Sequence, residues 1–250
     1  MPITHNAALI SFLDIEGMLG VLDAGVIVSI LEHQKNSGVK GKLAEFGTYK
    51  GRSAALLANY VGDDEELHLV DVAEYLELDK LRKISTNFEF HKMDSKFFVE
   101  QKLGVKSRDF RFVHSDGSHT FDNVYFDVQN ADNIMSDKGV LVIDDYYNPH
   151  YPQVAAAVFT YMAREKTDLT MALVGSNKCY ICRRGYQKTL IEFLKDGFQE
   201  MMEQFGTPVQ ISKTDRHDMM DCISFKGVPA DFPDKVYGPK LYGHYFGVKA

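Results

Sequence analysis

The sequence has no excess of positive charge and few cysteines. Its 250 residues contain 28 Lys and Arg against 35 Asp and Glu, a formal net charge of -7. Nucleic-acid surfaces need basic stripes to meet phosphates, so this balance argues against a nucleic-acid partner. Cys179 and Cys182 form a C-x-x-C pattern inside a strand-like run. Strand residues three positions apart face opposite sides, which is poor geometry for one zinc ion, so packed free thiols are expected.

Long apolar runs are also missing. No run approaches the roughly 18 residues of a membrane span, and residues 1–13 lack the basic region and apolar core of a signal peptide. The expectation is a cytoplasmic protein with no membrane partner. The apolar content of 45% and the charged content of 25% are ordinary for a globular protein. A chain of this length suits one sizeable α/β domain with extensions.

Short apolar runs and helical patterns alternate regularly along the chain. The first five runs cover residues 42–46, 67–70, 88–91, 110–114 and 140–143. Helical patterns fill the gaps at residues 74–86, 95–103, 120–136 and 152–166. This alternation predicts a Rossmann-like, doubly wound, mostly parallel sheet. Two later runs, 169–174 and 179–183, flank Gly175-Ser176-Asn177 and predict a final antiparallel hairpin, which makes seven strands.

Segments on both sides of this sheet extend the domain. The spacing of apolar residues over 7–36 predicts a helix, for which three roles are open: packing on the sheet edge, a dimer contact, or a cap over the substrate. The predicted division is an N-terminal helical segment (1–38), a central domain (39–185), and a C-terminal helix with an aromatic-rich arm (186–250). The arm and the apolar N-terminal helix together predict a homo-oligomer, because exposed aromatic surface is unfavourable for a monomer.

Acidic residues gather where two of the predicted strands end. Asp116 follows one strand, and Asp144 and Asp145 follow the next. Because ligands bind off the carboxyl ends of parallel strands, these carboxylates should share one rim of the sheet with His119. Three hard oxygen ligands suit Mg²⁺ or a similar cation. An imidazole one turn past Asp116 is placed to accept a proton from a substrate.

The loop after the first strand is rich in glycine but lacks two common motifs. Neither the dinucleotide fingerprint nor the P-loop fits, and the pattern that remains is E-x-G-x-x-x-G from Glu45 to Gly51. Gly47 allows a turn and a close backbone approach, and Gly51 lets a helix begin near a ligand. Glu45 can bind an ammonium group, and Asp71, at the end of the next strand, suits a ribose diol. These features predict a site for an adenosine that carries a cationic amino acid.

Together these motifs resemble a known family. The segments E-F-G-T-Y-K-G-R-S, Asp71, M-D-S, D-G-S-H and I-D-D-Y look like those of the class I S-adenosylmethionine-dependent methyltransferases. Within that class they are most similar to the metal-dependent O-methyltransferases of the macrocin and cephamycin-biosynthesis type. The resemblance covers about residues 40–185. One departure is Asp144, where relatives often carry Glu, and this shortens one metal ligand by a methylene.

The resemblance implies a role for each motif residue. Asp116, Asp144 and Asp145 would bind Mg²⁺, and His119 would be the general base. S-adenosylmethionine would be bound near the residues Glu45, Gly47, Tyr49, Gly51, Ser53, Asp71, Asp94 and Asp116, with Glu45 and Tyr49 toward its methionine end.

The resulting hypothesis is a Mg²⁺-dependent O-methyltransferase acting on a hydroxyl of a small molecule. A sugar or polyketide-like diol is the favoured acceptor, and a catechol-like aromatic is the second. The alternative is a non-catalytic S-adenosylmethionine-binding module or partner subunit. A metal-dependent hydrolase is a third interpretation, but it would leave the glycine loop without a purpose.

Overall fold

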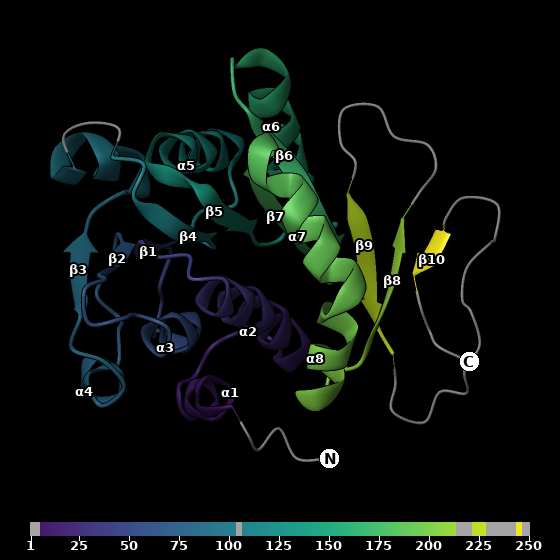
Figure 1. The fold of residues 1–250 in the computed structure, drawn as a ribbon. Helices are drawn as coiled ribbons and strands as arrows, with labels where there is room; N and C mark the ends of the chain where they lie inside the picture. The colour runs from purple at the N-terminus through teal and green to yellow at the C-terminus, as the bar shows by residue number, and fades with distance from the viewer. Residues whose placement is uncertain (1–5, 104–106, 214–221, 229–243, 247–250) are drawn as a thin grey trace.

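A computed structural model of the chain describes residues 6–103, 107–213, 222–228 and 244–246. These residues form one mixed sheet of ten strands with helices on both faces (Figure 1). The strand order is β10-β8-β9-β6-β7-β5-β4-β1-β2-β3. The strands are β1 Lys42–Phe46, β2 Leu67–Asp71, β3 Phe88–Lys92, β4 Phe110–Ser115, β5 Met135–Ile143, β6 Leu169–Gly175, β7 Lys178–Arg183, β8 Val209–Lys213, β9 Ile223–Gly227 and β10 His244–Phe246.

Helices cover the sheet in two layers (Figure 1). One layer contains α1 to α4 together with α7 and α8, and the other contains α5 and α6. The α-helices are α1 Ala7–Ser11, α2 Val21–Asn36, α3 Arg52–Ala58, α4 Leu78–Arg82, α5 Phe121–Ile134, α6 Pro152–Arg164, α7 Arg184–Asp196 and α8 Phe198–Gln204. Shorter turns are the 3₁₀ segments η1 Phe12–Asp14 and η2 Ser95–Phe97, and the π-helical segment η3 Val99–Leu103.

The predicted doubly wound sheet is confirmed in its central strands. Strands β3, β2, β1, β4 and β5 are parallel neighbours, and β7 pairs antiparallel with both β5 and β6. The hairpin does not end the sheet, however, because β9 pairs with β6, and β8 and β10 follow. The predicted count of seven strands was therefore too low. Of the predicted C-terminal arm, residues 214–221, 229–243 and 247–250 lie outside the described residues.

Both faces of the central strands are buried, as a sheet covered by two helix layers requires. Leu43 and Phe112 face one apolar cluster, whereas Ala44 and Val113 face the other. The two cysteines follow the same alternation: Cys182 packs in the first cluster and Cys179 in the second. Both are buried free thiols, as predicted from their spacing.

The N-terminal segment departs from the single helix that the sequence predicts over 7–36. It breaks into α1, η1 and α2, with an irregular stretch before Gly20, which caps α2. Positions 24–31 of α2 are all buried, so this helix lies inside the fold rather than on its surface. The buried positions of α2 offer no surface to a second subunit, whereas Ile10 and Leu13 of the preceding segment are 49% and 45% exposed, so the oligomer stays a prediction.

Three other predicted helices differ in length or type. The helix expected over 74–86 is reduced to α4, and the one over 95–103 is built from 3₁₀ and π turns. The helix after Gly185 divides at Gly197 into α7 and α8. Among the residues that the structure describes, no helix combines the length and apolarity needed to cross a membrane.

A buried carboxyl group joins α5 to the sheet. Asp127 is 1% exposed and accepts hydrogen bonds from Ser95 Oγ at 2.6 Å and Ser115 Oγ at 2.8 Å. Burial raises the pKa of Asp127 to about 7, so the carboxyl group holds a proton in the folded state at pH values where it is ionised in the unfolded chain. This group therefore couples folding to pH.

We expect Asp127→Asn to change how stability depends on pH. In the wild type, folded Asp127 keeps a proton that the unfolded chain releases above about pH 4, so stability falls as pH rises toward 7. The amide cannot ionise, so the variant should gain stability relative to the wild type across this range, by at most about 4 kcal/mol. Urea unfolding from pH 4 to pH 8 measures the difference. The exposed Asp137→Asn serves as control, and an Asp127→Asn curve parallel to the wild type would contradict the assignment.

Candidate active site

Backbone hydrogen bonds continue the parallel ladder past the strand ends. Gly47 N–H donates to Val70 O, Asp116 N–H to Phe46 O, and Asp144 N–H to Ser115 O, all at 2.8–2.9 Å. Each residue that follows a strand is thereby fixed relative to the neighbouring strand. Asp71 at the end of β2, Asp116 after β4 and Asp144 after β5 therefore lie along one rim of the sheet, as predicted from the sequence.

The glycine loop fits tightly against the loop after β4. Gly47 has φ +84°, and a Cβ on it would overlap the backbone of Asp116 and Gly117. Only glycine therefore lets the two loops approach this closely. Gly51 has φ +93° and precedes α3, where an added Cβ would lie 2.9 Å from Leu76 Cδ2. The left-handed conformation extends to Tyr49, with φ +44°.

Asp71 holds this loop in place. Its Oδ2 accepts hydrogen bonds from the backbone N–H groups of Thr48 and Tyr49, both at 2.9 Å, and its Oδ1 accepts one from Ala73 N–H at 3.1 Å. The carboxylate also faces the cavity described next, so it can orient the loop and offer remaining lone pairs to a ligand.

A cavity of about 380 Å³ opens above these loops. Six of the eight predicted cofactor residues line it: Gly47, Tyr49, Ser53, Asp71, Asp94 and Asp116. The predicted base, His119, lines it as well. The structure thus brings the glycine loop, the acid at the end of β2 and the histidine onto one continuous surface.

The other two predicted cofactor residues lie elsewhere. Gly51 shapes the loop without lining the cavity. Glu45 is fully buried inside β1, and its Oε1 lies 2.8 Å from Nδ1 of the equally buried His114. The Glu45 side chain therefore points into the protein interior, where it contacts His114, and not into the cavity where an ammonium group was expected.

The N-terminal segment supplies one wall of the cavity. Glu16, Gly17, Met18 and Leu19 line it. Arg52, the first residue of α3, fixes this wall by donating to Ile15 O at 2.9 Å and Leu19 O at 3.1 Å. No motif in the sequence pointed to residues 16–19. Arg52, which holds them, does stand in the E-F-G-T-Y-K-G-R-S segment that carries the family resemblance.

His119 lies between two carboxylates. Its Nε2 is 2.8 Å from Asp145 Oδ2 and 3.8 Å from Asp116 Oδ1, and its ring stacks on Tyr151 with centroids 4.4 Å apart. The negative charges of Asp116 and Asp145 raise the pKa of His119 despite its partial burial. The arrangement provides an oriented imidazole whose protonated form is stabilised.

Asp145 is held away from the other predicted metal ligands. Its backbone is left-handed, with φ +55°. Its Oδ1 accepts hydrogen bonds from the side-chain amides of Asn148 at 2.8 Å and Asn177 at 2.6 Å. Its Oδ2 faces His119. This carboxylate therefore supports the histidine.

Asp144 forms an ion pair with Lys178, a lysine that no sequence motif contains. Lys178 is 2% exposed, and its Nζ contacts Asp144 Oδ1. Burial opposes the ammonium charge, but Asp144, Asp116 and Asp23 together raise the pKa of Lys178. Burial likewise opposes ionisation of Asp144, and Lys178 and His114 nevertheless lower its pKa.

The donor atoms present do not fit a magnesium ion. At this rim, one oxygen or nitrogen atom from each of Asp116, Asp144 and His114 lies within 4.8 Å of the others, and Asp145 does not belong to this group. His114 contacts Glu45 through Nδ1 and leaves Nε2 without a hydrogen-bond partner among the described residues, as a ligating imidazole would, so the misfit lies with the missing third carboxylate and with the charge of Lys178. A unit charge and a divalent ion 4 Å apart repel by about 8 kcal/mol at an effective dielectric constant of 20, so the Lys178 ammonium disfavours a second cation.

Part of the chain matches a known protein domain. A family model described as a methyltransferase domain matches residues 44–146. No curated protein sequence matches the chain. The match contains the glycine loop, Asp71, His119 and all three predicted metal-binding aspartates.

Several solved structures share the fold. The O-methyltransferase NovP is 16% identical with a TM-score of 0.56, over 67% of this chain and 81% of that chain. A putative O-methyltransferase from Klebsiella pneumoniae is 12% identical with a TM-score of 0.53, over 72% and 91%. CalS11, a calicheamicin methyltransferase, is 13% identical with a TM-score of 0.50, over 64% and 78%. Residues 44–146 thus match a methyltransferase domain, and the solved structures share the fold, in agreement with the resemblance drawn from the motifs.

We expect Asp71→Ala to weaken S-adenosylmethionine binding. The substitution removes two backbone hydrogen bonds that hold the glycine loop, one more from Ala73 N–H, and a carboxylate that faces the cavity. The loss should be about 1.5–3 kcal/mol, or roughly 10- to 150-fold in Kd, the usual scale for a charged hydrogen-bonding group. Calorimetry measures it, with Asp79→Ala on α4 as the control. Unchanged affinity in Asp71→Ala would contradict the cofactor site.

Proposed function

We propose that the protein transfers the methyl group of S-adenosylmethionine to a hydroxyl oxygen of a small molecule. The observation that carries this proposal is that His119 lines the same cavity as the glycine loop and Asp71. An imidazole oriented by two carboxylates thus lies on the surface that would hold the methyl donor. A module that only bound the cofactor would have no need for this group.

The proposed reaction requires little beyond position and one proton transfer. The acceptor oxygen forms a bond to the methyl carbon while the carbon–sulfur bond breaks, leaving S-adenosylhomocysteine. His119 takes the hydroxyl proton, and Asp145 and Asp116 stabilise the imidazolium that forms. Because the sulfonium is already activated, the protein contributes mainly by holding donor and acceptor in line.

The acceptor would bind beside His119. Tyr151 stacks on the imidazole, and Met18 in the N-terminal wall is 88% exposed, so both offer apolar surface near the proposed base. A sugar or polyketide-like diol is the first acceptor class to test, and a catechol-like aromatic is the second. The O-methyltransferase and calicheamicin methyltransferase named above act as precedents for the reaction on the same fold.

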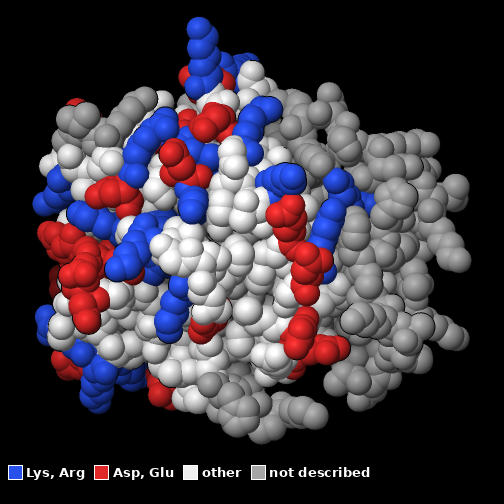
Figure 2. All heavy atoms as spheres, in the orientation of Figure 1, with Lys and Arg blue, Asp and Glu red and all other residues white. Residues whose placement is uncertain are grey.

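The partners of this reaction are small molecules. The face drawn in Figure 2 intersperses Lys and Arg with Asp and Glu, which does not resemble the basic stripe of a nucleic-acid surface. A homo-oligomer stays a prediction. The Mg²⁺ ion expected from the sequence is not part of this proposal, because the donor atoms around Asp116 and Asp144 do not fit it, and no step above passes through it.

The activity assay should separate chemistry from binding at His119. We expect His119→Gln to bind S-adenosylmethionine about as well as the wild type but to turn over about 10²- to 10⁴-fold more slowly, the usual contribution of a general base. Mass spectrometry of S-adenosylhomocysteine and methyl ether across the two acceptor classes measures turnover. The exposed His150→Gln serves as control. Equal turnover in His119→Gln and the wild type would remove the base assignment.

The pH profile gives an independent check on the same residue. The base must be neutral to accept a proton, so turnover should rise with pH and level off above the pKa of His119. Because Asp116 and Asp145 raise that pKa, the midpoint should lie above 6.5. Asp145→Asn removes one of the charges and should move the midpoint to lower pH. A midpoint that stays in place in Asp145→Asn would show that another group controls the profile.

A further inference from the structure

The position of Lys178 follows from strand pairing. Strand β7 runs antiparallel to β5, with Cys179 opposite Ile143. The residue before Cys179 therefore lies beside the residue after Ile143, which places Lys178 against Asp144 at the rim that holds the site. The hairpin of β6 and β7 thus inserts a lysine side chain under the carboxylates of β4 and β5.

We propose that the Lys178 ammonium is the built-in cation of this carboxylate cluster, so that methyl transfer by this protein needs no divalent metal. The inference rests on the proposed function for its meaning in catalysis, but its central claim concerns cation binding alone. Lys178 is a positioning residue here, because at 2% exposure it lies beneath the cavity and does not line it.

The ammonium contacts one carboxylate and has further negative charge nearby. Lys178 Nζ contacts Asp144, after β5, and a carboxylate oxygen of Asp116, after β4, lies within 4.8 Å of one of Asp144. The charges of Asp116 and of Asp23, on α2, add to that of Asp144 in raising the pKa of Lys178. A buried ammonium beside this much negative charge can act as the counter-ion of the cluster.

A divalent ion would have to displace this arrangement. The carboxylates that could bind it are Asp144, which contacts Lys178, and Asp116, one oxygen of which lies within 4.8 Å of an Asp144 oxygen. The third nearby group is His114, whose Nδ1 contacts Glu45 and whose Nε2 has no hydrogen-bond partner among the described residues. The predicted third carboxylate, Asp145, is engaged by His119 and two asparagine amides. The ammonium and a metal ion are therefore alternatives at one place.

The test compares metal binding by the wild type and by two variants of Lys178. Lys178→Met removes the charge while keeping a long side chain, and Lys178→Arg keeps the charge. Mn²⁺ and Mg²⁺ are titrated calorimetrically into each EDTA-treated protein. We expect the wild type and Lys178→Arg to bind neither ion with a Kd below about 1 mM, and Lys178→Met to bind one equivalent of Mn²⁺ at least about tenfold more tightly.

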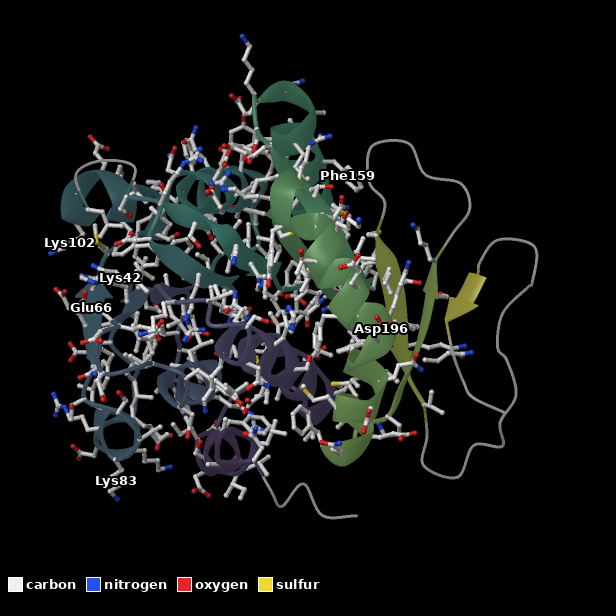
Figure 3. The ribbon with its side chains drawn as sticks, in the orientation of Figure 1. Lys42, Glu66, Lys83, Lys102, Phe159 and Asp196 are labelled. Atoms are coloured by element: carbon white, nitrogen blue, oxygen red, sulfur yellow. The ribbon has the colours of Figure 1, made fainter. Side chains whose placement is uncertain are left out.

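Lys42→Met is the matched control. Lys42 forms an ion pair with Glu66 at 3.2 Å at the N-terminal ends of the neighbouring strands β1 and β2, where Figure 3 labels the two side chains beside each other. This lysine is partly exposed and far from the carboxylate cluster in the strand register, so its removal should create no Mn²⁺ site. A gain confined to Lys178→Met would therefore come from the vacated cation position and not from the loss of any lysine.

The outcomes are decisive in both directions. One equivalent of Mg²⁺ or Mn²⁺ bound to the wild type at micromolar Kd, or turnover that EDTA abolishes and Mg²⁺ restores, would overturn the proposal. So would a folded Lys178→Met that gains no Mn²⁺ binding. If Lys178→Met fails to fold, the wild-type and Lys178→Arg titrations still decide. Absence of turnover with every acceptor would count against the proposed function but would leave the titrations valid.

Discussion

The backbone contacts between the ends of neighbouring strands determine the rest of the site. Gly47, Asp116 and Asp144 each donate an N–H to the strand beside them, so the loops after β1, β4 and β5 are fixed to one another before any side chain acts. The missing side chain of Gly47 allows the first of these loops to meet the second. Because the spacing of loops is set by the sheet, the cavity and the carboxylates keep their relative positions through rigid elements rather than through mobile segments.

The sequence predicted the sheet and its rim because both depend on local patterns. Apolar runs of four or five residues that end in Asp mark buried parallel strands. This rule correctly placed Asp71, Asp116 and Asp144 at the carboxyl ends of three strands. Side-chain direction within the rim was harder to predict. Glu45 was expected to bind an ammonium group near the end of the strand over 42–46, yet the strand alternation points its carboxylate into the protein interior, against His114. Asp145 adopts a left-handed backbone conformation that no local sequence pattern predicted.

Long-range contacts account for the features that the sequence did not reveal. Lys178 reaches the site only because β7 pairs with β5, across 34 residues of chain from its partner Asp144 (178 − 144). Glu16–Leu19 reach the cavity because Arg52 binds two carbonyls of the N-terminal segment. The predicted helix over 7–36 was wrong at this point, since a periodic apolar pattern does not show where a chain must turn to cover a ligand.

A cation supplied by the protein changes what the acceptor must provide. A metal ion orients an acceptor by binding two adjacent oxygens, which explains the expectation of a diol. The Lys178 ammonium is buried beneath Asp144 and offers no open coordination position, so a single hydroxyl would suffice and its direction would have to come from the cavity wall. That wall contains Met18 and the imidazole of His119, stacked on Tyr151. Shape and apolar contact, rather than chelation, would then select the acceptor.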